Sequence, residues 1–191
     1  MTAVEKSQSL SIEEYIEGEQ HSEVRHEFIG GLVYAMAGAS DEHNAISLNL
    51  ASAILAHLRG KSCRVFMADS KVRLRADADD IFYYPDLMVA CDPRDTNRFF
   101  KRFPCVLVEV LSESTERIDR REKFLSYTQI ETLEEYILVA QEKMEVTLYR
   151  RTNQWHPEIL KGATQPLPLA SIDFSINLSA IYEGVQFPAR G

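Results

Sequence analysis

The 191-residue chain has few cysteines and no long apolar run, and both features limit the classes of protein to which it can belong. Cys63, Cys91 and Cys105 are far apart in the sequence and form no C-x-x-C pair, so neither a zinc ribbon nor a disulfide framework is expected. No apolar stretch approaches the roughly 20 residues that cross a bilayer, and the N-terminal residues lack the basic-then-apolar order of a secretory signal. We therefore expect a cytoplasmic protein whose reduced thiols are small core residues.

Three catalytic signatures are also missing. The pair His26–Glu27 is not followed by a histidine at the spacing of a zinc protease. Gly30–Gly31 is an isolated pair, so there is no glycine-rich loop to hold a nucleotide phosphate. No serine lies in a G-x-S-x-G turn of the kind that carries a hydrolase nucleophile. These absences disfavour a zinc protease, a nucleotide-binding fold and a serine hydrolase of the α/β type.

Basic charge is scarce overall, since the net charge is -8, but the acids are concentrated at one end. Residues 1–42 carry a net charge of -7, which leaves -1 for the other 149 residues. Residues 94–123 hold eight bases and six acids, a net of +2. This distribution permits phosphate binding without requiring it, because a basic run can also be a simple solvated face.

Periodicity and turn residues predict one mixed α/β domain over residues 1–191, with a core at about 10–185. Ser11 and Glu14 form a capping box at the start of a helix that ends near Gly18. Gly30–Gly31 predicts a hairpin turn, and the acidic stretch Asp77–Asp80 predicts a polar loop. Further helices are expected at about 41–59, 115–129 and 178–182. Strands are expected at 63–67, 71–75, 84–90, 105–111, 136–140 and 146–150, with a continuation at 155–160.

Two carboxylates interrupt apolar segments that otherwise read as strands. Asp86 lies in Tyr83–Val89, and Glu109 lies in Val106–Leu111. An ionised carboxylate in apolar surroundings is costly unless a cation or hydrogen bonds compensate it. Two such groups on adjacent strands suit a hard divalent cation, which prefers oxygen ligands. The other interpretation is that both acids lie at strand ends and pair with arginines.

These motifs, in this order, resemble the PD-(D/E)XK restriction-endonuclease-like superfamily and, more closely, its Uma-type family of endonucleases. The resemblance covers about residues 10–185. The stretches that carry it are His26–Gly31, Gly38–Asn44, Tyr84–Val89, Val108–Arg117 and Glu122–Phe124.

The resemblance implies a four- or five-stranded mixed sheet flanked by helices, a Mg²⁺ or Mn²⁺ cofactor, nucleic acid (DNA above all) as substrate, and a homodimer. It assigns Asp86 and Glu109 as metal ligands together with the Val110 carbonyl, and it places Glu27 beside the metal. The chain departs from the superfamily pattern at Leu111, where a lysine is usual. The resemblance implies that Lys123, on the following helix, takes over that role.

Several further residues are candidates for contacts with nucleic acid. Arg117, Arg120 and Arg121 are expected to position phosphates without reading sequence. Lys71 is either a phosphate contact or a plain charge on an edge strand. His43 either orients a water or phosphate or caps its own helix.

Two alternatives to an endonuclease stay open at this point. One is a catalytically degenerate nucleic-acid-binding module, which Leu111 favours. The other is an acidic interaction or assembly protein on the same fold.

Overall fold

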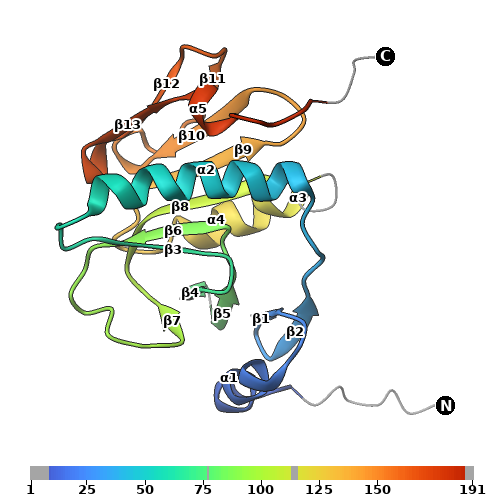
Figure 1. Cartoon of the computed structure of the whole chain (residues 1–191). Helices are drawn as coiled ribbons and strands as arrows, with labels where there is room; N and C mark the ends of the chain where they lie inside the picture. Colours follow the sequence, from blue (N-terminus) through green and yellow to red (C-terminus); the bar gives the residue numbers. More distant parts are fainter. Residues whose placement is uncertain (1–8, 77, 113–115, 188–191) are drawn as a thin grey trace.

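The computed structural model describes residues 9–76, 78–112 and 116–187. Asp77, which belongs to the expected polar loop, and Glu113–Thr115, which belong to the family motif, lie outside the described residues. The described chain forms a six-stranded sheet, a five-stranded sheet and a two-stranded sheet, with helices on their faces (Figure 1). This confirms the expected α/β architecture with a central mixed sheet flanked by helices, although the largest sheet has six strands instead of the expected four or five.

The six-stranded sheet has the order β11-β10-β9-β8-β6-β3. Only the central pair β8–β9 is parallel, and all its other pairs are antiparallel, so the sheet is mixed. β8 is its longest strand and is buried almost throughout. The strands are β3 (Arg64–Met67), β6 (Leu87–Ala90), β8 (Pro104–Leu111), β9 (Glu135–Ala140), β10 (Glu145–Arg150) and β11 (Glu158–Lys161).

The alternation of side chains along β8 supplies two apolar layers, one on each face of the sheet. Val106, Val108 and Val110 pack into one buried cluster, whereas Leu107 and Leu111 pack into another. Glu109 has the parity of the second set and therefore points to the second face. The identity of the element that covers each face decides which residues reach Glu109.

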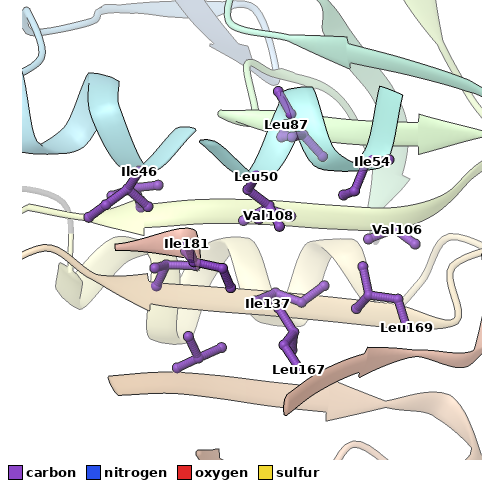
Figure 2. Close-up of a cluster of buried hydrophobic side chains, with 14 of the residues drawn as sticks. Ile46, Leu50, Ile54, Leu87, Val106, Val108, Ile137, Leu167, Leu169 and Ile181 are labelled. Carbon is purple, nitrogen blue, oxygen red and sulfur yellow. The ribbon is translucent and has the colours of Figure 1, made fainter. Parts of the chain in front are cut away.

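Helix α2 (Asp41–Leu58) covers the first face (Figure 1). Of the two residues that could cap it in the sequence, Ser40 and Asp41, Ser40 is the cap and accepts a hydrogen bond from the His43 N–H. Its buried face, with Ile46, Leu50 and Ile54, packs against valines of β8 (Figure 2). The same cluster includes residues of α5 (Leu178–Ile181), β12 (Pro166–Leu169) and β13 (Phe174–Asn177), which closes the C-terminal part over this core.

A second helical segment covers the opposite face. It consists of α3 (Glu116–Ile118), a π-helical turn η1 (Asp119–Lys123) and α4 (Phe124–Tyr127). Tyr127 packs with Leu107, Leu111 and Tyr136 in the second cluster. A π turn is wider than an α turn and is often found at functional positions. Here it carries Lys123.

The five-stranded sheet, with the order β2-β1-β5-β4-β7, lies beside this unit. Gly30 and Gly31 have φ angles of 55° and 95°, as the predicted tight hairpin turn requires. Helix α1 (Ile12–His21) begins with the predicted capping box, and its Tyr15 packs on Phe28 and Phe82. The strands are β1 (His26–Ile29), β2 (Leu32–Ala35), β4 (Lys71–Ala76), β5 (Asp79–Tyr83) and β7 (Phe100–Lys101).

Some local expectations were wrong. Asp79 and Asp80 begin β5 instead of lying in a loop, because Ala76 and Arg75 of β4 pair with them across a short turn. Residues 92–103, for which the sequence predicts only a charged connection, contain the short strand β7, held by parallel pairing with Lys71 and Val72 of β4. The helix predicted to end near Gly18 continues to His21.

The expectation of three reduced cysteines was also wrong. Cys63 and Cys91 form a disulfide, with their Cα atoms 4.0 Å apart, and Cys105 is the free cysteine among the described residues. The pairing of Arg64 with Ala90 in β3 and β6 brings the two cysteines opposite each other. No helix in the described ranges is long and apolar enough to cross a membrane.

Candidate active site

Glu109 is a buried acid on β8, and only 4% of its side chain is exposed. The Tyr127 hydroxyl donates a hydrogen bond of 2.8 Å to Oε1, and Lys123 Nζ lies 3.2 Å from the same oxygen. Burial raises the pKa of Glu109 well above its usual value, against the Lys123 ammonium, which lowers it. The neighbouring acids Asp119, Asp86 and Glu27 raise the pKa further, so this carboxyl needs cationic neighbours to ionise.

Lys123 is the centre of the carboxylate cluster. Its Nζ lies 3.0 Å from Glu27 Oε1, 3.2 Å from Glu109 Oε1 and 3.4 Å from Asp119 Oδ1. It also lies 5.5 Å from the centre of the Tyr83 ring. Burial lowers the pKa of Lys123, but the three carboxylates outweigh burial and raise it well above its usual value. Lys123 is therefore held as an ammonium despite being almost wholly buried.

Glu27 reaches this ammonium from β1 of the other large sheet. Its register partner is Tyr34 of β2, and the backbone N–H of Tyr84 donates a hydrogen bond of 3.4 Å to its Oε1. The side chain of Glu27 is 15% exposed, so it is more accessible than Glu109. Residues from β1, β8 and the π turn thus converge on one cation.

Asp86 lies at the start of β6, beside Glu109. Leu87 pairs with Val108 across β6 and β8, and one more step in this register sets Asp86 opposite Glu109. Asp86 Oδ2 accepts a hydrogen bond of 2.6 Å from the Val110 N–H and lies 3.1 Å from His43 Nε2. The two acids singled out in the sequence are therefore neighbours on adjacent strands. Among the described residues, their polar contacts come from histidine, lysine, tyrosine and backbone, and no arginine pairs with either.

His43 reaches Asp86 from the first turn of α2. Ser40 already caps this helix, so the ring of His43 is free to contact the acid instead. The other ring nitrogen, Nδ1, is buried and has no hydrogen-bond partner within the described part of the chain. The contact between His43 Nε2 and Asp86 Oδ2 fixes the orientation of the Asp86 carboxylate.

The donor set suits a hard divalent cation. The contacts that the described residues make to Glu109 reach Oε1, and those to Asp86 reach Oδ2, so the second oxygen of each carboxylate remains for an ion. Across residues 9–76, 78–112 and 116–187 no group of three or more His, Cys, Asp or Glu side chains is placed to hold a metal ion by itself. Lys123 explains this, because its ammonium lies between Glu27 and Glu109. Mg²⁺ is commonly held by one or two carboxylates with waters and substrate phosphate, which is the set that Asp86 and Glu109 offer.

The position of Leu111 shows why the lysine comes from a helix. Leu111 has the same parity on β8 as Glu109, and it is buried beneath Tyr127 in the second core cluster. A lysine there would take an apolar place in the core. The π turn η1 covers this same face of the six-stranded sheet, and its Lys123 contacts Glu109. Lys123 therefore reaches Glu109 from a helical segment, while position 111 stays apolar.

The predicted nucleic-acid contacts are spread more widely. Arg117 and Arg120 pair with Glu122 and Glu116 on the exposed side of the same helical segment, and Arg121 is exposed there. Lys71 is not an edge-strand charge, because β4 lies between β5 and β7 and the residue is 7% exposed. Lys71 lies in a separate hollow, beside Tyr84.

Asp119 and Tyr127 join the cluster although the sequence assigned them no role. The signal was present, since Asp119, Lys123 and Tyr127 recur at intervals of four residues and so share a helix face. All three face β8. The Tyr136 hydroxyl donates to the Asp119 carbonyl and so anchors the π turn to β9.

Comparisons with known proteins identify the family and the fold of the chain. The sequence profile of the Uma2 family, described as "Putative restriction endonuclease", matches residues 12–179. Two uncharacterized proteins of Synechocystis sp. are similar over 180 residues. One, slr1290, is 37% identical over 93% of this chain and 94% of its own length. The other, sll1609, is 31% identical over 92% and 98%.

The fold is also similar to a crystal structure from Anabaena variabilis, titled as a putative nuclease belonging to DUF820. The TM-score is 0.71 over 86% of this chain and 93% of that chain. At 17% sequence identity, this likeness shows a shared fold.

Proposed function

Because the chain belongs to the Uma2 family of restriction-endonuclease-like proteins, we propose that Asp86, Glu109, Lys123 and Glu27 form the active centre of a metal-dependent endonuclease. Its substrate would be a phosphodiester of nucleic acid, with DNA as the expected polymer and Mg²⁺ or Mn²⁺ as the cofactor. The observation that carries the proposal is the convergence on Lys123 of acids from β1 and β8, with Asp86 on the strand next to Glu109.

Asp86 and Glu109 would hold the ion through the oxygens that their protein partners leave, with the Val110 carbonyl as the expected third ligand. A bound divalent cation would supply Lewis-acid charge relief at the phosphate and make water a better nucleophile. The protein's own part is to orient both carboxylates. His43 and the Val110 N–H fix Asp86, while Tyr127 and Lys123 fix Glu109.

Lys123 would act on the developing negative charge of the phosphate. Its three carboxylate neighbours keep it protonated, so it cannot act as a general base at neutral pH. A preorganised ammonium in a water-poor site stabilises a developing anion far better than it would in water. Glu27, the more exposed acid, would accept a hydrogen bond from the attacking water.

Exposed guanidinium groups would hold the polymer against this centre. Arg117, Arg120 and Arg121 lie on the helical segment that carries Lys123, and their phosphate contacts would not depend on sequence. Their existing surface ion pairs are weak and easily exchanged for phosphate. A homodimer that acts on both strands is part of the proposal, and sedimentation of the free protein checks it.

Cleavage of nucleic acid by matched variants tests this proposal. Supercoiled plasmid, linear duplex and single-stranded DNA would be incubated with wild type, Asp86→Asn and Glu109→Gln in Mg²⁺, Mn²⁺ or EDTA. We expect metal-dependent cleavage by the wild type and a loss of about 10²- to 10³-fold or more in each variant. The control is Glu135→Gln, which removes the charge of another buried acid, one that is satisfied by Ala170 and Ser171. Its cleavage rate should equal that of the wild type.

One observation favours a binding module as the second candidate. Leu111 fills the usual lysine position, and Lys123 is already engaged by three carboxylates. Binding of metal and DNA by folded wild type and by the Glu135→Gln control, with no cleavage in any metal, would establish that candidate instead. Equal cleavage by Asp86→Asn and wild type would exclude this centre.

A further inference from the structure

A polar hollow lies at Tyr84, two residues before Asp86 of the candidate active centre. Tyr83 lies beneath Lys123, whereas its neighbour Tyr84 lines a separate hollow of about 360 Å³. Parts of α1, the turn between β3 and β4, and β7 with the loop before it form its wall. This volume lies within the usual range of small-molecule sites, roughly 300–1,000 Å³.

The hollow carries an excess of positive charge. Four cations line it, against two carboxylates; the cations are Arg25, Lys71, Arg98 and Lys101, and the acids are Glu19 and Asp69. Both acids already have partners. Arg25 pairs with Asp69 at 3.1 Å, and Glu19 accepts hydrogen bonds from Tyr84 and His26. A ligand in the hollow would therefore meet the remaining cations.

Two of these cations have donors to spare. Lys71 Nζ donates to the Tyr84 hydroxyl at 3.1 Å, its one hydrogen bond to a described residue, although an ammonium has three donors. Burial lowers the pKa of Lys71, and the neighbouring carboxylates of Glu19 and Asp69 offset this only in part. Arg98 is exposed and makes no hydrogen bond or ion pair with the described residues. By contrast, Lys101 is bound by the carbonyls of Asp95 and Asn97.

Aromatic rings also line the hollow. Phe99, adjacent to Arg98 in the chain, lines the hollow and is 43% exposed. Phe66 lines it as well, with Lys101 Nζ 5.2 Å from the centre of its ring. An exposed ring beside cations offers a stacking surface for a base and donors for its phosphate. An inorganic anion would contact only the cations and would leave the aromatic ring unused.

We propose that this hollow binds one nucleotide, with its phosphate at Lys71 and Arg98 and its base against Phe99. The inference deepens the proposed function and rests on it for one point, that the bound nucleotide is the neighbour of the scissile phosphate. Tyr84 and Asp86 are two residues apart, so the two sites are joined by a segment that spans at most about 7 Å. The nucleotide would thus fix the register of the strand in the active centre.

Titration of the full-length protein with deoxyadenosine 5′-monophosphate in EDTA tests the pocket without metal or cleavage. Inorganic phosphate and deoxyadenosine are titrated separately. We expect Arg98→Ala to weaken binding of the nucleotide by about tenfold or more. Phe99→Ala should weaken binding of the nucleotide and leave that of phosphate unchanged. Arg59→Ala is the matched control, since Arg59 is another exposed arginine, at the far end of α2 and outside the hollow.

Lys71→Met would remove the buried cation, and circular dichroism checks that this variant folds. The exposed Arg98 and Phe99 variants decide the question if it does not. Absence of nucleotide binding at millimolar concentrations would overturn the proposal. So would equal affinities in Arg98→Ala and Arg59→Ala.

Competition with a short single-stranded oligonucleotide distinguishes the two sources of the ligand. Displacement of the oligonucleotide by the mononucleotide supports a strand residue, whereas independent binding supports a free nucleotide. Nucleotide binding that depends on Arg98, in a protein that cleaves nothing, would leave the pocket established and the nuclease proposal refuted. Cleavage without nucleotide binding would support the nuclease proposal and refute the nucleotide pocket.

Discussion

Lys123 Nζ and Glu109 Oε1 lie 3.2 Å apart, although one side chain comes from a helix and the other from a strand that it covers. The pair is almost entirely buried, with 7% and 4% of the side chains exposed. Coulomb attraction between them has to offset the desolvation of both charges, and it does so only with further hydrogen bonds. Tyr127 and Glu27 supply those bonds. The stability of this buried pair and the proposed chemistry therefore share Lys123, Glu109 and Glu27.

Lys123→Met should destabilise the protein by about 3–5 kcal/mol in the absence of divalent metal, because it leaves buried carboxylates without their cation. Urea unfolding at neutral pH measures this change. Arg121→Ala, an exposed substitution in the same π turn, should change stability by less than about 0.5 kcal/mol. A loss of similar size in both variants would show that the turn is fragile and that the ion pair is unimportant.

Divalent metal should partly repair the same variant. With the ammonium gone, an ion between Glu27 and Glu109 takes its place, so Mg²⁺ should raise the melting temperature of Lys123→Met more than that of the wild type. Thermal unfolding in Mg²⁺ and in EDTA gives both shifts. An equal shift in the two proteins would mean that the ion binds away from Lys123.

Tyr127→Phe should reduce metal affinity and cleavage by about 10- to 100-fold, since it removes the hydrogen bond that orients Glu109. Tyr136→Phe is a matched control, because Tyr136 is equally buried and packs on Tyr127 but donates to a backbone carbonyl. Both variants should lose about 1 kcal/mol or somewhat more of stability. Only Tyr127→Phe should lose function, as measured by metal titration and cleavage rate.

Much of this arrangement could be predicted from local sequence rules. Interactions within a few residues mark the start of α1 at Ser11, the start of α2 at Ser40 and the hairpin turn at Gly30–Gly31. Asp86 and Glu109 stand out because a charge inside an apolar strand needs a partner. The interval of four residues also put Lys123 on one helix face with Asp119 and Tyr127.

Local sequence rules could not predict contacts between segments that are far apart in the sequence. The Cys63–Cys91 disulfide depends on the register of β3 against β6. The separation of 28 residues between the two cysteines does not reveal that register. Asp79 and Asp80 read as a loop because their strand character comes from pairing with β4. The bond from His43 to Asp86 and the π turn at Lys123 likewise arise from packing across the sheet.

Thiol counting checks the disulfide. Alkylation of unfolded protein should modify one thiol without reductant and three after reduction. In the folded protein Cys105 should resist alkylation near neutral pH, because burial raises the pKa of its thiol to about 11 and little thiolate exists. Reduction should lower stability by about 3 kcal/mol, the effect of releasing a loop of this length. Three reactive thiols without reductant would contradict the bond.

Glu19 should make stability depend on pH in the acid range. Burial opposes ionisation of its carboxyl, but hydrogen bonds from Tyr84 and His26 outweigh burial and hold the pKa of Glu19 below its usual value. The folded state therefore favours the carboxylate. Its contribution is fully present above the unfolded pKa of about 4.3, and it is lost as pH falls through the lower folded value.

Glu19→Gln removes this titration, so the stability gap between wild type and variant should be widest near pH 6 and should shrink as pH falls below about 4. Urea unfolding at a series of pH values measures the gap. Glu17→Gln is the control, since Glu17 is an exposed acid on the same helix and the gap should stay near zero throughout. A gap for Glu19→Gln that is constant from pH 6 to pH 3 would mean that lost packing, and not the carboxylate charge, sets the cost.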